Sequence, residues 1–116
     1  MKTYISNLIA SVKAASDINA NYFIGLDGAV CGAGAVALGV SIDSAATGEG
    51  LPVAMNGLVP VIAGGSISAG DAVKSDANGK AVAASAGDMA LGYAMEAASA
   101  GDEVMVKLGT VNLNAA

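Results

Sequence analysis

Apolar residues occupy every second position in four short stretches of the chain, which is the period of a β-strand with one buried face. Between such stretches, dipeptides such as Asn56-Gly57 and Asn78-Gly79 indicate tight turns. Short strands separated by turns predict an all-β fold. The alternating residues form the predicted core: Val36, Leu38, Val40, Ile42, Leu51, Val53, Met55, Met89, Leu91, Tyr93, Met95, Val104, Val106 and Leu108.

This pattern occurs twice at a fixed offset. When residues 33–55 are laid on residues 86–108, an offset of 53, five of the first seven positions are identical. Each copy contains a strand, a small acidic loop and a second strand. Gly39 and Gly92 occupy the same place opposite the core face, where a missing Cβ lets a neighbouring backbone approach or the strand bend. We therefore expect a small, curved β-barrel built on an internal strand-loop-strand repeat.

Asn56-Gly57 is expected to close a hairpin between residues 53–55 and 58–62. Pro52 and Pro60 flank this hairpin. Because proline cannot donate a hydrogen bond to a β-ladder, each proline is best placed on an edge or at a bulge. The hairpin is therefore a candidate for the sheet edge.

The amino-terminal segment fits two structures. Its apolar residues fit a helical stripe, whereas residues 8–14 also alternate as a strand does. The repeat-built core is complete without this segment, so we expect an arm that contacts another subunit or a partner. Folding back onto the barrel is the alternative. The predicted division is an arm at 1–8, a single β domain at 9–109 and a tail at 110–116, and the expected contact residues are Tyr4, Ile5, Leu8 and Ile9.

Charge and side-chain size narrow the range of partners. Five Lys, no Arg and ten Asp or Glu give a formal charge of −5, and the lysines are scattered. Nucleic acid and anionic membrane are therefore not expected partners. No run approaches the ~18 apolar residues of a membrane helix. With 26 Ala and 16 Gly, the chain buries little area per residue, which favours association as a source of stability.

The sequence gives little support for enzyme activity. The sequence has no His, which excludes nucleophile systems that use imidazole as the base and the usual Cys/His zinc site. Cys31 has no neighbouring cation and is expected to be an inert, buried thiol. We expect no enzyme activity, no metal and no cofactor. Solvated loop charges are expected, with a weak calcium site as the alternative, at Asp43, Glu49, Glu96, Asp102 and Glu103.

Several short motifs follow one another in a specific order and spacing. They are Asn21-Tyr22-Phe23-Ile24-Gly25-Leu26-Asp27-Gly28, Ala37-Leu38-Gly39-Val40, Ala45-Ala46-Thr47-Gly48-Glu49, Ile67-Ser68-Ala69-Gly70-Asp71-Ala72-Val73, Asn78-Gly79-Lys80-Ala81-Val82 and Ala90-Leu91-Gly92-Tyr93-Ala94. Together they resemble a family of tailed-bacteriophage proteins, first catalogued as a domain of unknown function and since described as capsid cement or head decoration proteins. The resemblance spans about residues 13–108.

The resemblance implies a compact β-barrel or β-tulip with an extended first segment, which favours the strand for residues 9–14. It also implies a virion protein, made in the host cytoplasm, that binds the major capsid protein on the outer surface of the expanded head, commonly as a homotrimer. No catalytic residue carries over from the family. Relatives often have a basic residue and an aromatic where this chain has Tyr22 and Phe23, so the contact of that basic residue is not expected here.

Cementing needs no chemistry, because many symmetry-repeated weak contacts across capsid joints add up to high avidity. One alternative is a display module or head-fibre base that binds a host ligand such as a glycan, although four aromatic residues leave little for a glycan platform. A small phage hydrolase is the other alternative, and the absence of His disfavours it.

Overall fold

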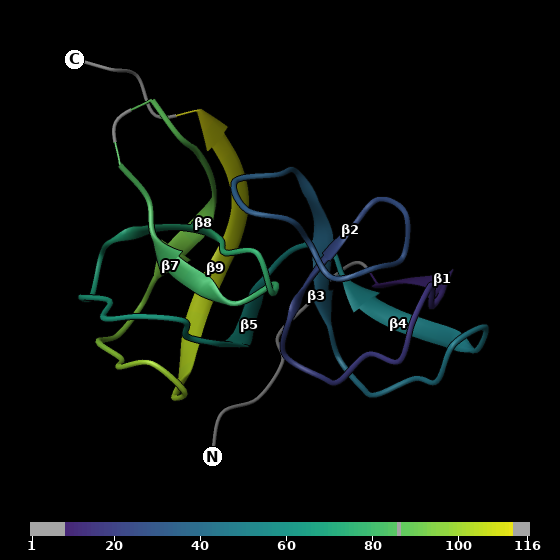
Figure 1. Cartoon of the computed structure of the whole chain (residues 1–116). Coiled ribbons are helices and arrows are strands. Elements are labelled where there is room, and N and C mark those ends of the chain that lie inside the picture. The colour runs from purple at the N-terminus through teal and green to yellow at the C-terminus, as the bar shows by residue number, and fades with distance from the viewer. Residues whose placement is uncertain (1–8, 86, 113–116) are drawn as a thin grey trace.

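The computed structural model describes residues 9–85 and 87–112, and in this part the chain forms nine strands and no helix (Figure 1). The all-β prediction is confirmed. The strands pair in two antiparallel sheets, with the orders β1-β4-β3-β2 and β5-β9-β8-β6-β7. Their bounds are β1 (Ile9–Lys13), β2 (Phe23–Gly25), β3 (Ala37–Ser41), β4 (Gly50–Ala54), β5 (Leu58–Ile62), β6 (Ala72–Ser75), β7 (Ala81–Ala83), β8 (Met89–Ala94) and β9 (Glu103–Asn112).

Each sheet contains one copy of a four-stranded unit. Strands β1, β4, β3 and β2 pair in the same order as β5, β9, β8 and β6, and the registers correspond as well. Ile9 pairs with Ala54 in one sheet, and Leu58 pairs with Lys107 in the other. We call residues 9–56 the first repeat and residues 58–112, which include the additional strand β7, the second repeat. The duplication is therefore longer than the segment found by aligning the sequence with itself.

The predicted division into an arm, a domain and a tail stays a prediction, because residues 1–8 and 113–116 lie outside the described part of the chain. β1 runs from Ile9 to Lys13, so the expectation of a strand there is confirmed. β9 continues to Asn112, which is beyond residue 110, where the tail was expected to begin. The β-tulip assignment stays a prediction.

Glycine allows the closest backbone contact within each repeat. A Cβ on Gly39 would collide with the carbonyl oxygen of Ala54, and a Cβ on Gly92 would collide with that of Lys107. Ala54 and Lys107 are corresponding residues, so both repeats need glycine for the same reason. The close approach expected from the sequence is confirmed at both positions.

The first repeat packs with one face of its sheet on the second repeat. Phe23, Val40 and Ala54 share that face and belong to the same buried cluster as the strands of the second sheet. The opposite face of the first sheet has a smaller cluster of its own. That cluster is closed by the loops that precede and follow the strands and consists of Ala14, Ile18, Ile24, Ala45, Leu51 and Val53.

The predicted core agrees with the structure in part. Buried members are Val40, Leu51, Val53, Leu91, Val104 and Val106, and half-buried members are Leu38, Ile42, Met55, Met89 and Leu108. Val36, Tyr93 and Met95 are exposed, so these three predictions are wrong. Val36 lies in the loop before β3. Tyr93 and Met95 correspond to Val40 and Ile42, whose face packs on the second repeat, but no third repeat in the described residues covers the second.

The predicted hairpin at Asn56-Gly57 is wrong as well. β4 and β5 belong to different sheets, so this turn connects the two repeats instead of closing a ladder. Pro60 does lie on an edge strand, β5. Pro52 lies on β4, which has β1 on one side and β3 on the other, so its placement at an edge is also wrong.

Pro52 is accommodated inside the sheet because its backbone nitrogen lies where the ladder is interrupted. β3 ends at Ser41, and Ile42 still donates its N–H to the carbonyl of Pro52 at 3.0 Å. The corresponding residue of the second repeat, Met105, has an N–H at this place, and it donates to a carboxylate oxygen of Glu96 at 3.0 Å. In the second repeat the N–H of Met105 is therefore satisfied by a carboxylate, whereas in the first repeat Pro52 has no N–H to satisfy.

We predict that Gly92→Ala destabilises the protein by about 2 kcal/mol or more, because the new Cβ must displace the carbonyl of Lys107. Gly32→Ala is the matched control. No atom lies within 4 Å of its added Cβ, so its effect should stay within about 0.5 kcal/mol. Urea denaturation measures both free energies of unfolding, and equal values for the two variants would contradict the prediction.

A double-mutant cycle tests the interrupted ladder. Glu96→Ala leaves the N–H of Met105 without its carboxylate and should cost about 1–3 kcal/mol of unfolding free energy. In a Met105→Pro background the donor is absent, as it is at Pro52, and the same substitution should cost less than about 0.5 kcal/mol. An equal cost in both backgrounds would show that Glu96 stabilises the fold through other contacts.

Candidate interaction surface

The acidic side chains accept hydrogen bonds, most of them from backbone N–H groups. All ten carboxylates of the sequence lie in the described part of the chain, and each accepts a hydrogen bond there. Nine of them accept from a backbone N–H, while Glu103 accepts from the side-chain amide of Asn21 at 3.4 Å. These carboxylates are therefore structural acceptors, a role that the expectation of simple solvated charges missed.

Four of the carboxylates build the same turn. The turns span residues 46–49, 68–71, 85–88 and 99–102, and each comes directly before a strand. In each, the N–H of the acidic fourth residue donates to the first carbonyl at 2.9–3.1 Å, and its carboxylate accepts the first N–H at 2.8–3.1 Å. The third residue is always glycine with φ between 85° and 91°. The recurring Ser-Ala-Gly-Asp sequence was the signal for this turn.

Hydrogen bonding lowers the pKa of two carboxyls on the loops. The backbone N–H of Thr47 and then its hydroxyl lower the pKa of Asp17, at 2.9 and 3.0 Å. The backbone N–H of Ser85 lowers the pKa of Asp88, as does the ammonium of Lys74 at 3.0 Å. These shifts favour charged carboxylates, whereas a general acid needs a raised pKa.

The single cysteine is placed as the sequence predicts. Cys31 is buried, its thiol lies 3.4 Å from the carbonyl oxygen of Ala35, and burial raises the pKa of that thiol. A raised pKa keeps the sulfur in its unreactive thiol form. Within the described ranges, no three metal-ligating side chains cluster, and no helix is long and apolar enough to cross a membrane.

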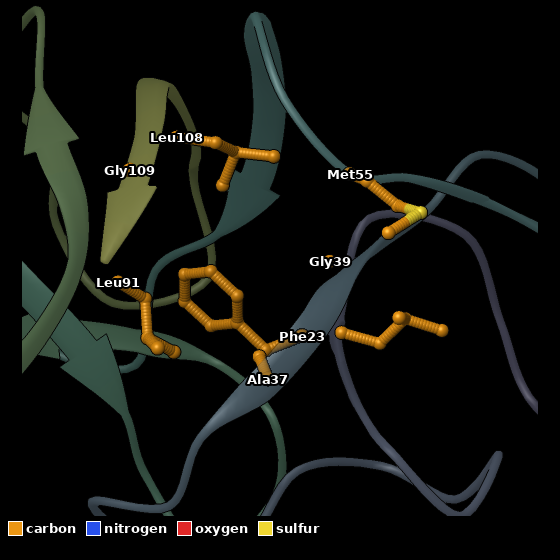
Figure 2. Close-up of a pocket in the computed structure, with 8 residues that line it drawn as sticks. Phe23, Ala37, Gly39, Met55, Leu91, Leu108 and Gly109 are labelled. Carbon is orange, nitrogen blue, oxygen red and sulfur yellow. The ribbon is translucent and has the colours of Figure 1, made fainter. Parts of the chain in front are cut away.

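A small apolar pocket of about 50 Å³ lies where the two repeats meet (Figure 2). The ring of Phe23 points from β2 toward Leu91 and Leu108 of the second repeat. Met55 lines the pocket at the end that belongs to the first repeat. The pocket holds at most about a water molecule or two, so it is a packing defect and not a ligand site.

The remaining apolar surface is gathered in three places. Ile9 is 56% exposed at the start of the edge strand β1. Leu26 is 70% exposed and lies with Val30 and Val36 around an open pocket of about 270 Å³. Tyr93 and Met95 are exposed on the second repeat. Of the expected contact residues, Ile9 is thus on the surface, whereas Tyr4, Ile5 and Leu8 lie outside the described residues.

The described residues thus form an all-β structure whose carboxylates hold its loops and whose large exposed apolar side chains lie in three places. The sequence model of the phage cement proteins matches residues 2–109, nearly the whole chain. The chain therefore belongs to the phage cement protein family. Among curated proteins, no sequence matches it.

A solved structure with a similar fold comes from the head of another phage. It is the base at the N-terminal end of the head fibre protein gp8.5 of bacteriophage phi29. The two structures superpose with a TM-score of 0.75 over 92% of this chain and 98% of the other, at 23% sequence identity. This similarity shows that the two proteins share a fold.

We predict that the protein loses stability in acid. The pKa values of Asp17 and Asp88 are lowered in the folded state, so their contribution is complete above the pKa of the unfolded chain, about 4, and is lost as the pH falls through the lower folded values. The melting temperature should be steady from pH 7 to about pH 5 and fall below about pH 4. Asp17→Asn keeps an acceptor oxygen and should make that fall less steep.

Proposed function

We propose that this protein cements the head of a tailed phage. In this role it binds the major capsid protein on the outer surface of the expanded head and holds neighbouring capsid subunits together without catalysing a reaction. The match of the phage cement family over residues 2–109 is the observation that carries the proposal. The fold supports it, since the exposed apolar side chains offer contact area and the carboxylates have structural partners.

The proposed contacts are many and individually weak. A capsid presents the same joint many times, so an oligomer that spans a joint gains avidity from each additional contact. We propose a homo-oligomer, with a trimer favoured by the family resemblance. The amino-terminal residues Tyr4, Ile5, Leu8 and Ile9 are proposed to add contacts with a neighbouring subunit or with the capsid. The net charge of −5 makes contact by shape and apolar area more suitable than long-range attraction to an acidic shell.

A head-fibre base is the second candidate. It is favoured by one observation, the TM-score of 0.75 with the base of the phi29 head fibre protein. In this alternative the protein also sits on the virion, but its task is to present a module that binds a host ligand. The two candidates differ in what happens to the capsid when the protein is removed.

We predict that the purified protein binds expanded heads of its own phage that lack it, and that it saturates at a number of copies set by capsid symmetry. Decorated heads should release DNA at a higher temperature than bare heads, because each bound oligomer must detach before the joint opens. Deletion of residues 1–8 should weaken head binding. Quantitative gel analysis of sedimented heads and a thermal DNA-release assay measure these effects.

Bare heads supplied with bovine serum albumin are the control for nonspecific protection. Full occupancy with an unchanged release temperature would contradict cementing and support the head-fibre candidate. Unchanged binding after deletion of residues 1–8 would remove the proposed arm contact while leaving cementing in place.

A further inference from the structure

Two asparagines of the chain, Asn56 and Asn78, are followed by glycine, whereas the others are followed by Leu, Ala or Tyr. In an Asn-Gly dipeptide the glycine nitrogen can attack the side-chain amide carbon of the asparagine, because glycine has no side chain that hinders the approach. The two dipeptides have the same intrinsic chemistry. Any difference in their reactivity therefore comes from the fold.

The turn at Asn78 is held by hydrogen bonds on both sides of the Asn78–Gly79 peptide. One carboxylate oxygen of Asp76 accepts the N–H of Asn78 at 2.8 Å and the N–H of Lys80 at 2.9 Å. The N–H of Gly79 itself donates to the carbonyl of Asp76 at 3.3 Å. The nitrogen that would have to attack thus already has an acceptor for its proton.

Gly79 is also packed against the first repeat. It is buried, and its carbonyl accepts the N–H of Phe23 at 2.8 Å. A Cβ on Gly79 would lie 2.9 Å from the carbonyl oxygen of Phe23. The nitrogen of Gly79 can turn toward the side chain of Asn78 only after the turn opens, and such local opening costs hydrogen bonds.

The second dipeptide, Asn56-Gly57, lies in the link between the repeats, after β4 and before β5. Asn56 is exposed and Gly57 is half-buried. The carbonyl of Gly57 accepts the N–H of Leu108 at 2.9 Å, but within the described ranges the N–H of Gly57 donates to no backbone carbonyl. The attacking nitrogen is therefore not held as the nitrogen of Gly79 is.

We propose that Asn56 is a site of spontaneous deamidation and that the turn at Asn78 protects that residue from the same reaction. The nitrogen of Gly57 attacks Cγ of Asn56 and closes a succinimide ring, and the side-chain NH₂ leaves with the proton of that nitrogen as ammonia. Water then opens the ring at either carbonyl and gives aspartate or isoaspartate. In sum, asparagine and water become aspartate or isoaspartate and ammonia, without an oxidant or a reductant.

The reaction changes the link between the repeats. Isoaspartate adds a methylene group to the main chain, and either product adds a negative charge to an acidic protein. Met55, which precedes the modified residue, lines the pocket where the two repeats meet (Figure 2). In a virion, which does not replace its proteins, the modified fraction would increase with age. This last consequence rests on the proposed function, whereas the reaction does not.

The test follows both asparagines in one sample of the purified full chain. The protein is incubated in heavy-oxygen water at mildly alkaline pH, so that deamidation during the later digestion carries no label, and its peptides are analysed by mass spectrometry. Asn56 should be converted about tenfold or more faster than Asn78, because only Asn78 must wait for its turn to open. Protein unfolded in urea is the control, and there the two asparagines should react at similar rates.

A pair of variants tests whether Asp76 provides the protection. Asp76→Ala removes the acceptor of two N–H groups of the turn and should raise the rate at Asn78 several-fold, while the rate at Asn56 stays the same. Asp76→Asn keeps an acceptor oxygen and is the matched control, in which Asn78 should remain protected. A circular dichroism melt shows whether each variant is folded. If Asp76→Ala does not fold, the comparison of native and urea-unfolded wild type decides.

Three outcomes would overturn the inference: equal conversion of the two asparagines in the folded protein, faster conversion of Asn78, or an Asn56 that reacts in urea but not in the folded protein. An unchanged rate at Asn78 in folded Asp76→Ala would remove the protective role of the carboxylate. Head binding is scored separately. A protein that deamidates at Asn56 but does not bind heads would contradict the proposed function and leave this inference in place.

Discussion

The packing of the first repeat on the second is the contact on which the rest of the structure depends. Phe23 is fully buried in it, in a chain with only four aromatic residues and an abundance of Ala and Gly. Neither repeat has enough large side chains to build a deep core alone, and burial per residue is what stabilises a small domain. Joining the two sheets places side chains of both repeats in one large cluster, and the first repeat keeps a smaller cluster on its other face.

The periodicity of the sequence predicted the strands of each copy, because alternation is a local property that one sheet face imposes. It could not predict which of two apolar faces would be covered. Val40 and Tyr93 occupy the same register, and only the position of the first repeat in front of the second decides that Val40 is buried. The edge placement of Pro52 was wrong for a related reason. A proline is excluded from a regular central ladder, but Pro52 lies where β3 ends and no ladder hydrogen bond is needed from its nitrogen.

The carboxylates show a second limit of local prediction. The absence of His argued against imidazole-based catalysis, but the acidic loops were expected to hold only solvated charges. In the structure the acids supply the acceptors that short turns need, and glycine supplies the positive φ that the turn requires. The repeated Ser-Ala-Gly-Asp sequence indicates this turn. It was not predicted, because the acidic residues were considered only as solvated charges or as ligands of a metal site.

These features fit the proposed function, which acts through contact and not through a reaction. In the first repeat both faces of the sheet are apolar: one face packs on the second repeat, and loops close the other. The packing of the repeats builds the larger core cluster, and it leaves Tyr93 and Met95 exposed on the second repeat, which no further repeat in the described residues covers. A monomer would gain by exchanging these residues for polar ones at little cost to its fold. Exposed apolar side chains of this kind are typical of a surface that contacts a partner, as the proposed cement function requires.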